Sequence, residues 1–466
     1  MTPYHSVIVG AGISGLSAAF ALQQRGADVL VLESSARVGG SMHTVNTPEG
    51  FMLDCGPTTV HSDDPRIDEH FAQLGIKDDF ILADPVSERR HFLLNGKPEQ
   101  LPTKLPAVIM TPLLSSWAKV RIFAEPFLPR SPMADESVLA FFTRRLGSEA
   151  TQRLIDPFIS SVYAGDPGQT SMKMAFPGLW EAEQRAGSIV RGMLTKPKPP
   201  KAAGAAPRRR AIFFGFKQGM STWPNAIARS LGPDQLWLNS AVSALTRTAN
   251  GWQVTVERGG HTEVVETERV ILACPAYIAA RLVAPLDTSV GSALAGIRYA
   301  PMTMIHLGYK REAVTHPLDG VGVLCPSIEK RKVLGILWSS TIFPGCVPPG
   351  TVLTTNFIGG MCNANLTKLD NAALIDMAMY ENEAILGAHG KPVMAHVSRW
   401  SHSISQYLSG HEGRIAEVKR LEAANPGLFL IGGYRDGMSV GKCWQNGVDL
   451  INRITGHVEQ SVMVAQ

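Results

Sequence analysis

A glycine-rich turn near the start of the chain constrains the fold more than any other feature. Gly10, Gly12 and Gly15 follow an apolar, β-branched run at residues 6–9 with G-x-G-x-x-G spacing, and a helix-forming run at 16–24 comes next. In such a strand–turn–helix unit the first glycine makes the tight turn, the second lets the backbone approach a diphosphate, and the third lets helix and strand pack closely. The helix N-terminus then faces the negative charge. The pattern predicts a dinucleotide-binding fold with a buried parallel sheet.

An acidic residue completes this pattern. Glu33 follows a second apolar run at 29–32, where a carboxylate accepts hydrogen bonds from a ribose diol. NAD and FAD both use such a turn, so these residues alone leave the choice of cofactor open. The adjoining segment 36–41, Ala-Arg-Val-Gly-Gly-Ser, resembles the R-x-G-G-[RS] extension of FAD-dependent amine oxidases. That resemblance implies FAD.

The composition limits the classes of function. Hydrophobic residues make up 45% and charged residues 18% of the 466 positions, as in globular enzymes with a large core. The net charge of +4 is too small to indicate a nucleic-acid partner. The six cysteines are scattered, which indicates reduced thiols in a cytoplasmic protein and no metal site. We expect neither a signal peptide nor a membrane-spanning helix, because the first strand starts at once and the apolar runs are short.

One segment has the character of a helix that lies on a membrane surface. Residues 105–128 are apolar, contain Trp117, Phe123 and Phe127, and carry a few basic residues. Aromatic and basic residues on an amphipathic helix favour the membrane interface. The alternative is a helical subdomain that packs on itself or on a partner. We therefore expect peripheral membrane association through this segment.

Several stretches in the middle and at the end of the chain resemble one family, protoporphyrinogen oxidase, the FAD enzyme of haem and chlorophyll synthesis. SSVYAGDP at 160–167 and SMKMAFPGLW at 171–180 are similar to its G-V-x-A-G-D-P and LS-x-K-x-AFP-x-LW signatures. The resemblance covers essentially the whole chain. The other matching stretches are GVGVLCPS (320–327), LGILWSSTIFP (334–344), TTNFIGG (354–360), WSHSISQYLSGH (400–411) and LFLIGGYRDGMSVGKC (428–443).

The fold that these patterns predict is α/β, in three parts. The first is a Rossmann-like, GR2-type FAD-binding domain assembled from separated segments, since dinucleotide-fold patterns stand at both ends of the chain. The second is a mixed-sheet substrate domain, and the third a mainly helical, membrane-associated domain with a flexible loop rich in Pro, Ala and Arg. The expected boundaries are 1–86, 212–281 and 391–466 for the first, 87–99 and 282–390 for the second, and 100–211 for the third, with the loop at 192–210.

The resemblance also implies which residues contact FAD. The first turn and its extension would hold the adenosine and the diphosphate, Gly56 to Thr58 would lie near the isoalloxazine, and the backbone of Val242 would pair with adenine. Neither a metal ligand nor a catalytic side chain is implied. The residues expected to bind the cofactor are Gly10, Gly12, Ile13, Ser14, Gly15, Glu33, Ser34, Arg37, Gly40, Ser41, Gly56, Pro57, Thr58, Val242, Trp400, Gly433 and Met438.

The expected substrate site is apolar with one cation. By resemblance, Leu324, Leu337 and Phe357 form the walls of a tetrapyrrole site, and an arginine in an R-[FY]-[ILV] strand meets a propionate.

The spacing to the turn Asn95-Gly96 puts His91 where the family has that arginine, with Arg90 beside it. A neutral histidine is a poorer carboxylate clamp than the fixed fork of an arginine. Arg90 can substitute only if the register shifts, because a one-residue shift turns a side chain to the other face of the sheet. In the remaining alternative both are solvated strand charges. Ser161 is a second departure, at a position where the family usually has glycine.

The reaction that the resemblance implies is oxidation of protoporphyrinogen IX to protoporphyrin IX. Hydride passes from a methylene-bridge carbon to FAD, and molecular oxygen then takes the electrons to give hydrogen peroxide, in three cycles. The partners are a porphyrinogen, oxygen and a peripheral membrane surface, and a homodimer is a further expectation.

Three alternatives stay open. The substrate could be coproporphyrinogen III, whose extra propionates would require extra cations. Another flavin amine oxidase or desaturase is the second alternative, for which Trp400 and Tyr434 are the candidates for an aromatic cage. A non-catalytic FAD-binding protein is the third.

Overall fold

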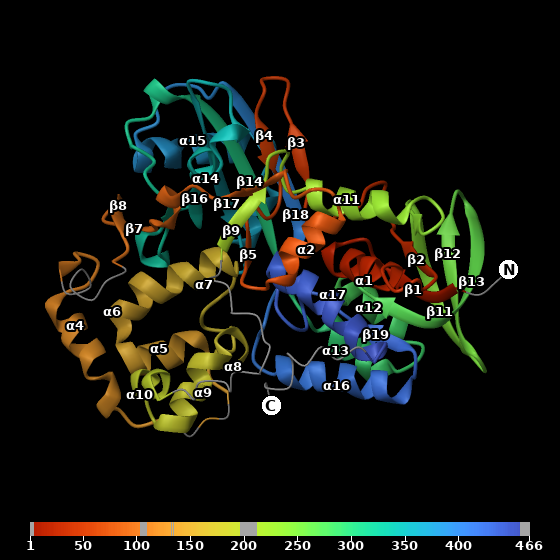
Figure 1. Ribbon diagram of the computed structural model, residues 1–466. Coiled ribbons are helices and arrows are strands. Elements are labelled where there is room, and N and C mark those ends of the chain that lie inside the picture. Colours follow the sequence, from red (N-terminus) through yellow and green to blue (C-terminus); the bar gives the residue numbers. More distant parts are fainter. Residues whose placement is uncertain (1–3, 103–109, 132, 134, 196–211, 457–466) are drawn as a thin grey trace.

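The protein consists of two seven-stranded sheets and a lobe of helices. The structure, a computed structural model, describes residues 4–102, 110–131, 133, 135–195 and 212–456. Figure 1 shows the first sheet with its helices on the right, the second sheet at the top and the helices α4 to α10 at the lower left. Two small sheets, β3–β4 and β5–β9–β6, lie between these parts.

The first sheet has a parallel core in the order β10–β2–β1–β13–β19. An antiparallel meander extends β13, and it contains an irregularity between Val242 and Ala244. The parallel core thus combines the first residues of the chain with segments more than two hundred residues away, as expected for this fold. The strands are β1 (Tyr4–Val9), β2 (Val29–Leu32), β10 (Leu236–Trp237), β11 (Ser240–Thr248), β12 (Gly251–Arg258), β13 (His261–Leu272) and β19 (Leu428–Leu430).

Helices cover both faces of this sheet because its central strands are apolar on both sides. Ile8 and Val31 pack in one core, whereas Val7 and Leu30 pack in the other. Burial of both faces is characteristic of parallel sheets. The first core is covered by α1 (Ile13–Gln23), α2 (Arg66–Gln73), α11 (Thr222–Leu231) and α17 (Val440–Ile454), and the second by α12 (Ala276–Val283), α13 (Thr288–Ala295) and α16 (His411–Ala424).

The second sheet has the order β18–β14–β17–β16–β15–β7–β8. All its pairs are antiparallel except β15 with β7. The predicted hairpin is present, and both turn residues adopt positive φ, 52° at Asn95 and 78° at Gly96. Its strands are β18 (Met394–Ser405), β14 (Tyr299–Lys310), β17 (Thr351–Gly359), β16 (Gly335–Leu337), β15 (Gly322–Leu324), β7 (His91–Leu94) and β8 (Lys97–Gln100).

Strand β18 belongs to a different domain from the one expected. It falls in the segment 391–466 that was expected in the FAD-binding domain, yet its backbone pairs with β14 of the second sheet. The residues after it, by contrast, return to the first sheet through α16 and β19. The apolar pattern of a strand does not determine which sheet it joins, because a strand would be paired and half-buried in either sheet.

The two faces of the second sheet have different surroundings. The outer face is covered by α15 (Asn371–Leu386), whose Leu374 and Ala378 pack on it. The inner face is turned towards the first sheet and the lobe, as its contacts with Cys55 and Ala164 show. Cross-strand pairing puts Leu324, Leu337, Phe357, Met302, Met304 and Trp400 on the inner face and His91, Val323, Ile336, Asn356 and Ile305 on the outer face.

The helical lobe, defined here as α4 to α10 with the turns between them, has its own core of Phe141, Phe142, Ile159 and Trp180. The helices α5 and α6 are separated at Gly147, which has φ of 90°. The lobe contains α4 (Ser116–Phe123), η2 (Glu125–Phe127), α5 (Val138–Leu146), α6 (Ser148–Ala150), the π-helical turn η3 (Thr151–Ile155), α7 (Asp156–Val162), α8 (Met172–Ala175), α9 (Pro177–Ala186) and α10 (Ile189–Leu194).

A buried ion-pair network links the elements of the lobe. The fully buried Arg145 pairs with Glu183 and, at 3.3 Å, with Glu125. Glu125 also accepts hydrogen bonds from Ser188 Oγ at 2.6 Å and from the amide of Ile189 at 2.8 Å, at the start of α10. A buried pair of this kind is tolerated only when the remaining polar atoms are satisfied.

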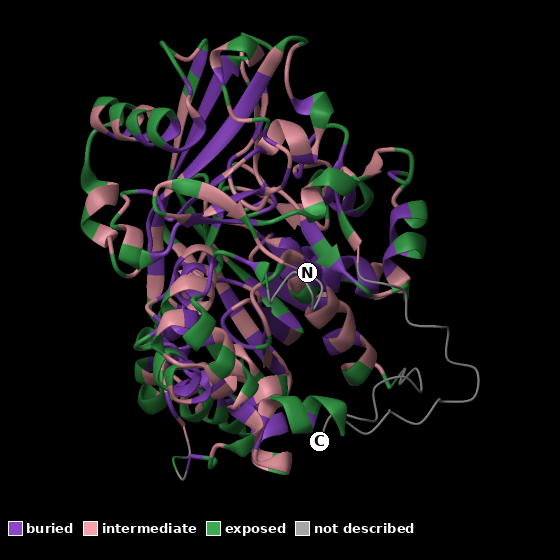
Figure 2. Cartoon of the chain, turned by 90° about the vertical axis from the view of Figure 1, so that its left-hand side faces the viewer, coloured by how far each residue is buried: buried purple, intermediate pink, exposed green. Residues whose placement is uncertain are grey.

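Figure 2 shows the long strands largely buried, while exposed residues gather on the helices.

The remaining elements are short. Among the described helices, none combines the length and apolar character needed to cross a membrane. The short elements are β3 (Thr44–Asn46), β4 (Met52–Asp54), β5 (Val60–Ser62), β6 (Phe80–Leu82), β9 (Ile212–Phe216), α14 (Ser339–Ile342), η1 (Pro85–Glu88), η4 (Arg311–Ala313), η5 (Ser327–Glu329), η6 (Pro344–Cys346) and η7 (Ala364–Lys368).

Candidate active site

The glycine turn after β1 has the geometry of an anion-binding helix start. Gly10 has φ of 107°, and a Cβ on Gly15 would lie 2.0 Å from Gly10 O, so the first and third glycines are required for the turn and for close packing. A Cβ on Gly12 would meet nothing within 4 Å, so this glycine borders open space. No side chain caps α1, which leaves the amides of its first turn, including those of Ile13 and Ser14, available for an anion.

A second pair of glycines approaches the same place. Gly39 forms a parallel bridge with Gly12, and its amide donates to Ala11 O at 2.8 Å. A Cβ on Gly40 would lie 3.5 Å from the Cα of Gly12. Arg37, half-exposed, donates to Val38 O at 3.2 Å, and the neighbouring Ser41 is exposed. The extension therefore brings backbone, a cation and a hydroxyl beside the open space at the turn.

The carboxylate of Glu33 is held in place at the end of β2. It accepts hydrogen bonds from the amide of Ala11 at 2.8 Å and from the amide and hydroxyl of Ser35 at 2.9 and 2.8 Å. Ser34 beside it is exposed, and the half-buried Val242 lies in the β-bulge of β11. A fixed, half-exposed carboxylate next to an uncapped helix start and a glycine pair suits the ribose and diphosphate of a dinucleotide. These residues therefore fit FAD.

The segment of Gly56, Pro57 and Thr58 adjoins this cradle. A Cβ on Gly56 would lie 2.0 Å from Ser41 O, so only glycine fits there. The preceding residue, Cys55, accepts a hydrogen bond from the indole N–H of Trp400 at 2.6 Å. The second sheet is thus tied through Trp400 to the expected isoalloxazine contacts.

The inner face of the second sheet brings the expected cofactor and substrate residues together. Phe357 and Trp400 pack against one apolar cluster formed by Ala164, Met302, Met304 and Leu334, together with Met361 and Ile404. Leu324 and Leu337 lie on the same face and, like Phe357, are half-buried. The three expected wall residues therefore share one surface with Trp400.

Sequence reasoning did not single out Met302, Met304 or Ala164 as wall residues. Methionine alternation along β14 looks like ordinary core, so it carried no signal. Ala164 lies inside the A-G-D-P stretch and has φ of 50°, although it is not glycine. Its carbonyl accepts the amide of Met361 at 2.8 Å, which holds this strained residue against the end of β17. Ser161, the departure from glycine, donates to Leu334 O at 2.5 Å and joins the lobe to β16.

The register of β7 with β15 puts Arg90 and His91 on opposite faces of the second sheet. His91 pairs with Val323 and faces the outer side, where its ring lies 5.0 Å from that of Trp338. Burial lowers the pKa of His91, so the ring is neutral near pH 7. Arg90, one residue earlier, is exposed, and its guanidinium lies 5.8 Å from the ring centroid of Phe213. Alternation along the strand puts Arg90 on the same side as Phe92, which is aligned with Leu324 of the inner face.

The inner face carries one buried polar chain. His306 Nδ1 lies 3.0 Å from Thr355 Oγ1, and that hydroxyl lies 2.8 Å from Ser339 Oγ. His306 Nε2 has no hydrogen-bond partner, and burial lowers the pKa of His306 to about 3. The histidine is therefore neutral, and none of the described residues of this wall is a charged base or acid.

Tyr434, a candidate for an aromatic cage, does not face Trp400. It is 1% exposed and packs in the second core of the first sheet. The cage that an amine oxidase would need is therefore not formed by this pair.

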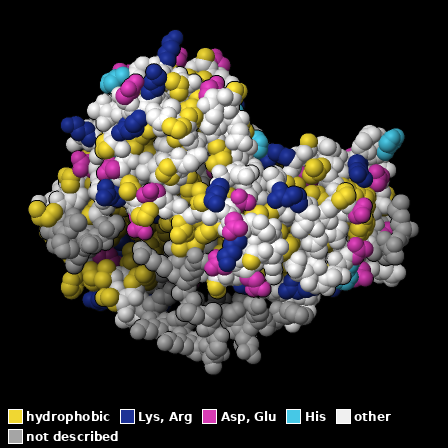
Figure 3. All heavy atoms as spheres, turned by 45° about the horizontal axis from the view of Figure 1, so that its top comes forward, with side chains coloured by type: hydrophobic (Ala, Val, Ile, Leu, Met, Phe, Trp, Pro, Cys, Tyr) yellow, Lys and Arg dark blue, Asp and Glu magenta, His cyan; other side chains and the backbone are white. Residues whose placement is uncertain are grey.

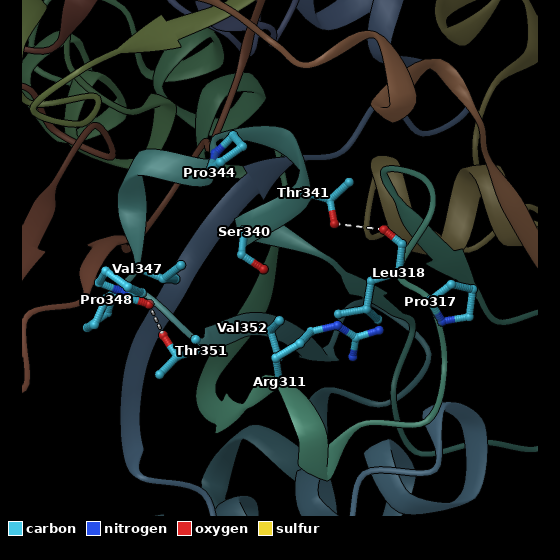
Figure 4. Close-up of a pocket in the computed structure, with 12 residues that line it drawn as sticks. Arg311, Pro317, Leu318, Ser340, Thr341, Pro344, Val347, Pro348, Thr351 and Val352 are labelled. Atoms are coloured by element: carbon cyan, nitrogen blue, oxygen red, sulfur yellow. Dashed lines mark hydrogen bonds between the residues drawn. The ribbon is translucent and has the colours of Figure 1, made fainter.

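A surface pocket lies elsewhere, beside α14 and β17. Figure 4 shows that Arg311, Pro317, Ser340 and Pro348 line it, none of which was expected at the site. The Arg311 guanidinium donates to Val314 O and His316 O at 2.7 and 2.9 Å, so it closes its own loop. All six cysteines are free, and no described group of His, Cys, Asp or Glu is arranged to hold a metal ion.

Comparison with known proteins identifies the class. The model of the flavin containing amine oxidoreductase family matches residues 13–449, and the chain belongs to this family. It is an FAD-dependent oxidoreductase.

Its relatives include protoporphyrinogen oxidases. Protoporphyrinogen oxidase 2, chloroplastic/mitochondrial, of Arabidopsis thaliana is 31% identical, with 97% of this chain and 94% of the relative covered. Coproporphyrinogen III oxidase of Bacillus subtilis is 25% identical, with 95% and 96% covered. A solved structure from Exiguobacterium sp. 255-15, provisionally named protoporphyrinogen oxidase, has a TM-score of 0.80 at 20% identity, with 98% of this chain and 100% of that chain covered.

Proposed function

We propose that the protein oxidises protoporphyrinogen IX to protoporphyrin IX and releases hydrogen peroxide. The observation that carries this proposal is the joint surface of Phe357 and Trp400 with the methionines of β14, an apolar wall next to the FAD cradle. A flat, largely apolar macrocycle suits such a wall. The relatives named protoporphyrinogen oxidase, at about 31% identity along 97% of the chain, support the same substrate.

FAD, when bound, supplies the hydride acceptor and passes the electrons to oxygen. The chain holds and orients it through Glu33, the amides after Gly12 and the Gly56 segment. The inner-face side chains exclude water and orient the macrocycle, which lets binding energy position the reacting carbon. Because His306 is neutral and the cluster around Phe357 and Trp400 contains no ionisable side chain, we propose that the chain provides no acid or base for the step.

We assign the propionate contact to Arg90. It is the cation at the inner side of β7, whereas His91 is buried on the outer side. A guanidinium binds a carboxylate with two parallel hydrogen bonds. Arg90 lies beside Phe213 of β9, so the macrocycle would extend from Trp400 towards the small sheet β5–β9–β6.

Coproporphyrinogen III is the second candidate, because a relative of that name matches 95% of the chain. Its additional propionates require additional cations at the rim. The direct test is an aerobic assay with each porphyrinogen that follows porphyrin fluorescence and peroxide together. Protoporphyrin formation with the higher kcat/KM supports the first proposal, whereas a preference for coproporphyrinogen supports the second.

We also propose that the lobe binds a membrane surface peripherally. Trp117 and Val120 of α4 are 76% and 57% exposed, and Phe127 after it is 81% exposed. Met193 and Leu194 of α10 are exposed as well. Figure 3 shows hydrophobic side chains gathered at the lower left, over the lobe.

The basic residues of α4 do not form the surface of this patch. Arg121 donates to the carbonyl oxygens of Arg144 and Arg145, and Lys119 Nζ donates to Thr111 O at 2.9 Å. These half-buried cations are engaged with carbonyl oxygens of the lobe, which leaves the apolar side chains for lipid. We therefore propose contact through apolar burial rather than through ion pairs.

A further inference from the structure

The segment 406–411, between β18 and α16, lies between the helical lobe and the loop that follows β19. On the lobe side, Gln406 Nε2 donates to Tyr163 O at 2.9 Å, and the amide of Ser171 donates to Tyr407 O at 2.8 Å. Thr170 and Leu408 form an antiparallel bridge beside these contacts. The segment is therefore attached to the lobe by both backbone and side chain.

On the other side, the segment holds residues 432–438, which we call the flavin loop. The hydroxyl of Tyr407 donates to Gly433 O at 2.6 Å and accepts from the amide of Gly437 at 3.0 Å. His411 Nε2 lies 2.7 Å from Tyr434 O. One hydroxyl thus joins the two ends of the loop, each next to or at an expected FAD contact, Gly433 and Met438.

Tyr407 is suited to hold this geometry. Its side chain is buried, with 7% exposure, and its ring lies 4.8 Å from that of His411. Burial raises the pKa of the phenol, so the hydroxyl stays protonated and keeps both hydrogen bonds at neutral pH. A hydrogen bond between buried partners is costly to lose, since both partners then stay unsatisfied.

We propose that Tyr407 is a positioning residue through which the helical lobe holds the flavin loop in its FAD-binding conformation. The same residue joins Ser171 through its backbone and the loop through its hydroxyl, so displacement of the lobe is transmitted to the loop through this one side chain. The proposal requires FAD binding but not a particular porphyrinogen. Its failure is therefore distinguishable from failure of the substrate assignment.

The test compares Tyr407→Phe with a matched control in the same loop. Tyr407→Phe keeps the ring and removes both hydrogen bonds. Tyr434→Phe removes a buried hydroxyl that has no hydrogen-bond partner, so it should be nearly neutral. Two readouts are independent of turnover: the dissociation constant of FAD, and amide hydrogen exchange of peptides that cover 432–438 in the FAD-bound protein.

We expect Tyr407→Phe to weaken FAD binding by about 5- to 30-fold, the range for one lost buried hydrogen-bonding group, and to accelerate exchange in the flavin loop. The visible circular dichroism of the bound flavin should change as well. Tyr434→Phe should match the wild type in all three measurements. Wild-type FAD affinity and exchange in Tyr407→Phe would overturn the proposal.

A second variant tests the connection to the lobe and does not depend on the folding of Tyr407→Phe. Gln406→Ala removes the contact with Tyr163 O, and the hydrogen bonds of the Gln406 amide nitrogen go to Tyr163 O and Ile404 O, outside the flavin loop. Faster exchange at 432–438 in this variant is the expected result. Exchange that is faster only near residue 163 would show that the lobe does not hold the flavin loop through this segment.

Discussion

The indole N–H of Trp400 donates a 2.6 Å hydrogen bond to the carbonyl oxygen of Cys55. This bond connects β18 of the second sheet with the residue that precedes Gly56, where only a glycine fits against Ser41. Trp400 therefore fixes the inner face of the second sheet and the Gly56 segment relative to each other. Phe357 packs in the same cluster as Trp400, so the apolar wall adjoins the cofactor cradle.

Arg90→Ala should raise KM for the porphyrinogen by about tenfold or more, because a charge-assisted hydrogen bond contributes roughly 1.5–3 kcal/mol. KM should not rise as the pH increases towards 8, because Arg90 keeps its charge there and burial lowers the pKa of His91. His91→Gln serves as the comparison. It should lower the free energy of unfolding and leave KM unchanged. Steady-state kinetics between about pH 6 and 8 show which residue contacts the propionate. A rise of KM with pH that His91→Gln abolishes would assign this contact to His91 instead of Arg90.

Phe357→Ala should lower kcat/KM for the porphyrinogen without releasing FAD. Loss of a buried phenylalanine costs about 3–5 kcal/mol in a packed core, and Phe357 is only half-buried, so the effect should be smaller. Ile358→Ala is the matched control, because the next residue of β17 faces α15 on the outer side. That control should lower the free energy of unfolding and leave KM unchanged. Equal kinetic effects of the two substitutions would argue against the assignment of the wall.

The buried His306 predicts an acid-sensitive fold. Its pKa is about 3 in the folded protein against 6.5 for the free side chain, so the unfolded chain binds the extra proton below pH 6.5. The contribution of this site to the free energy of unfolding is therefore complete above pH 6.5. It falls by about 1.4 kcal/mol per pH unit as the pH drops towards 3. Urea unfolding of wild type and His306→Gln at pH 7, 6 and 5 measures the difference. Parallel pH dependences in the two proteins would refute the prediction.

The lobe should bind neutral liposomes in high salt, since the proposed contact is apolar. Trp117→Glu combined with Phe127→Glu places charges on the patch and should abolish flotation with the liposomes. Val264→Glu is the control, because Val264 is 50% exposed on β13, outside the lobe. Binding that requires anionic lipid and low salt would contradict the apolar contact and indicate ion pairs instead.

The sequence predicted the features that depend on local chemistry. The Gly10 turn, the helix that follows it and the Asn95-Gly96 turn are all present, because spacing alone specifies such turns. The parallel core and the mixed second sheet were predicted from the apolar runs and from the family resemblance. Segment assignment was less accurate, since β18 pairs with β14 although the residues that follow it belong to the first sheet.

The side to which a residue points was harder to predict. Whether Arg90 or His91 faces the site depends on the register of β7 with β15, a pairing between residues more than two hundred positions apart. The methionines of β14 and the hydroxyl of Tyr407 carry no local signal, because their roles arise only from long-range packing. Tyr434 appeared suitable for a cage by composition, but the fold buries it in the core of the first sheet.

Anaerobic mixing with each porphyrinogen shows whether the bound flavin takes electrons from the macrocycle. We expect protoporphyrinogen IX to bleach the visible flavin absorption of the purified protein, faster than coproporphyrinogen III does, and oxygen to restore the absorption with release of peroxide. Flavin that stays oxidised with both porphyrinogens, while a primary amine reduces it, would contradict protoporphyrinogen oxidation.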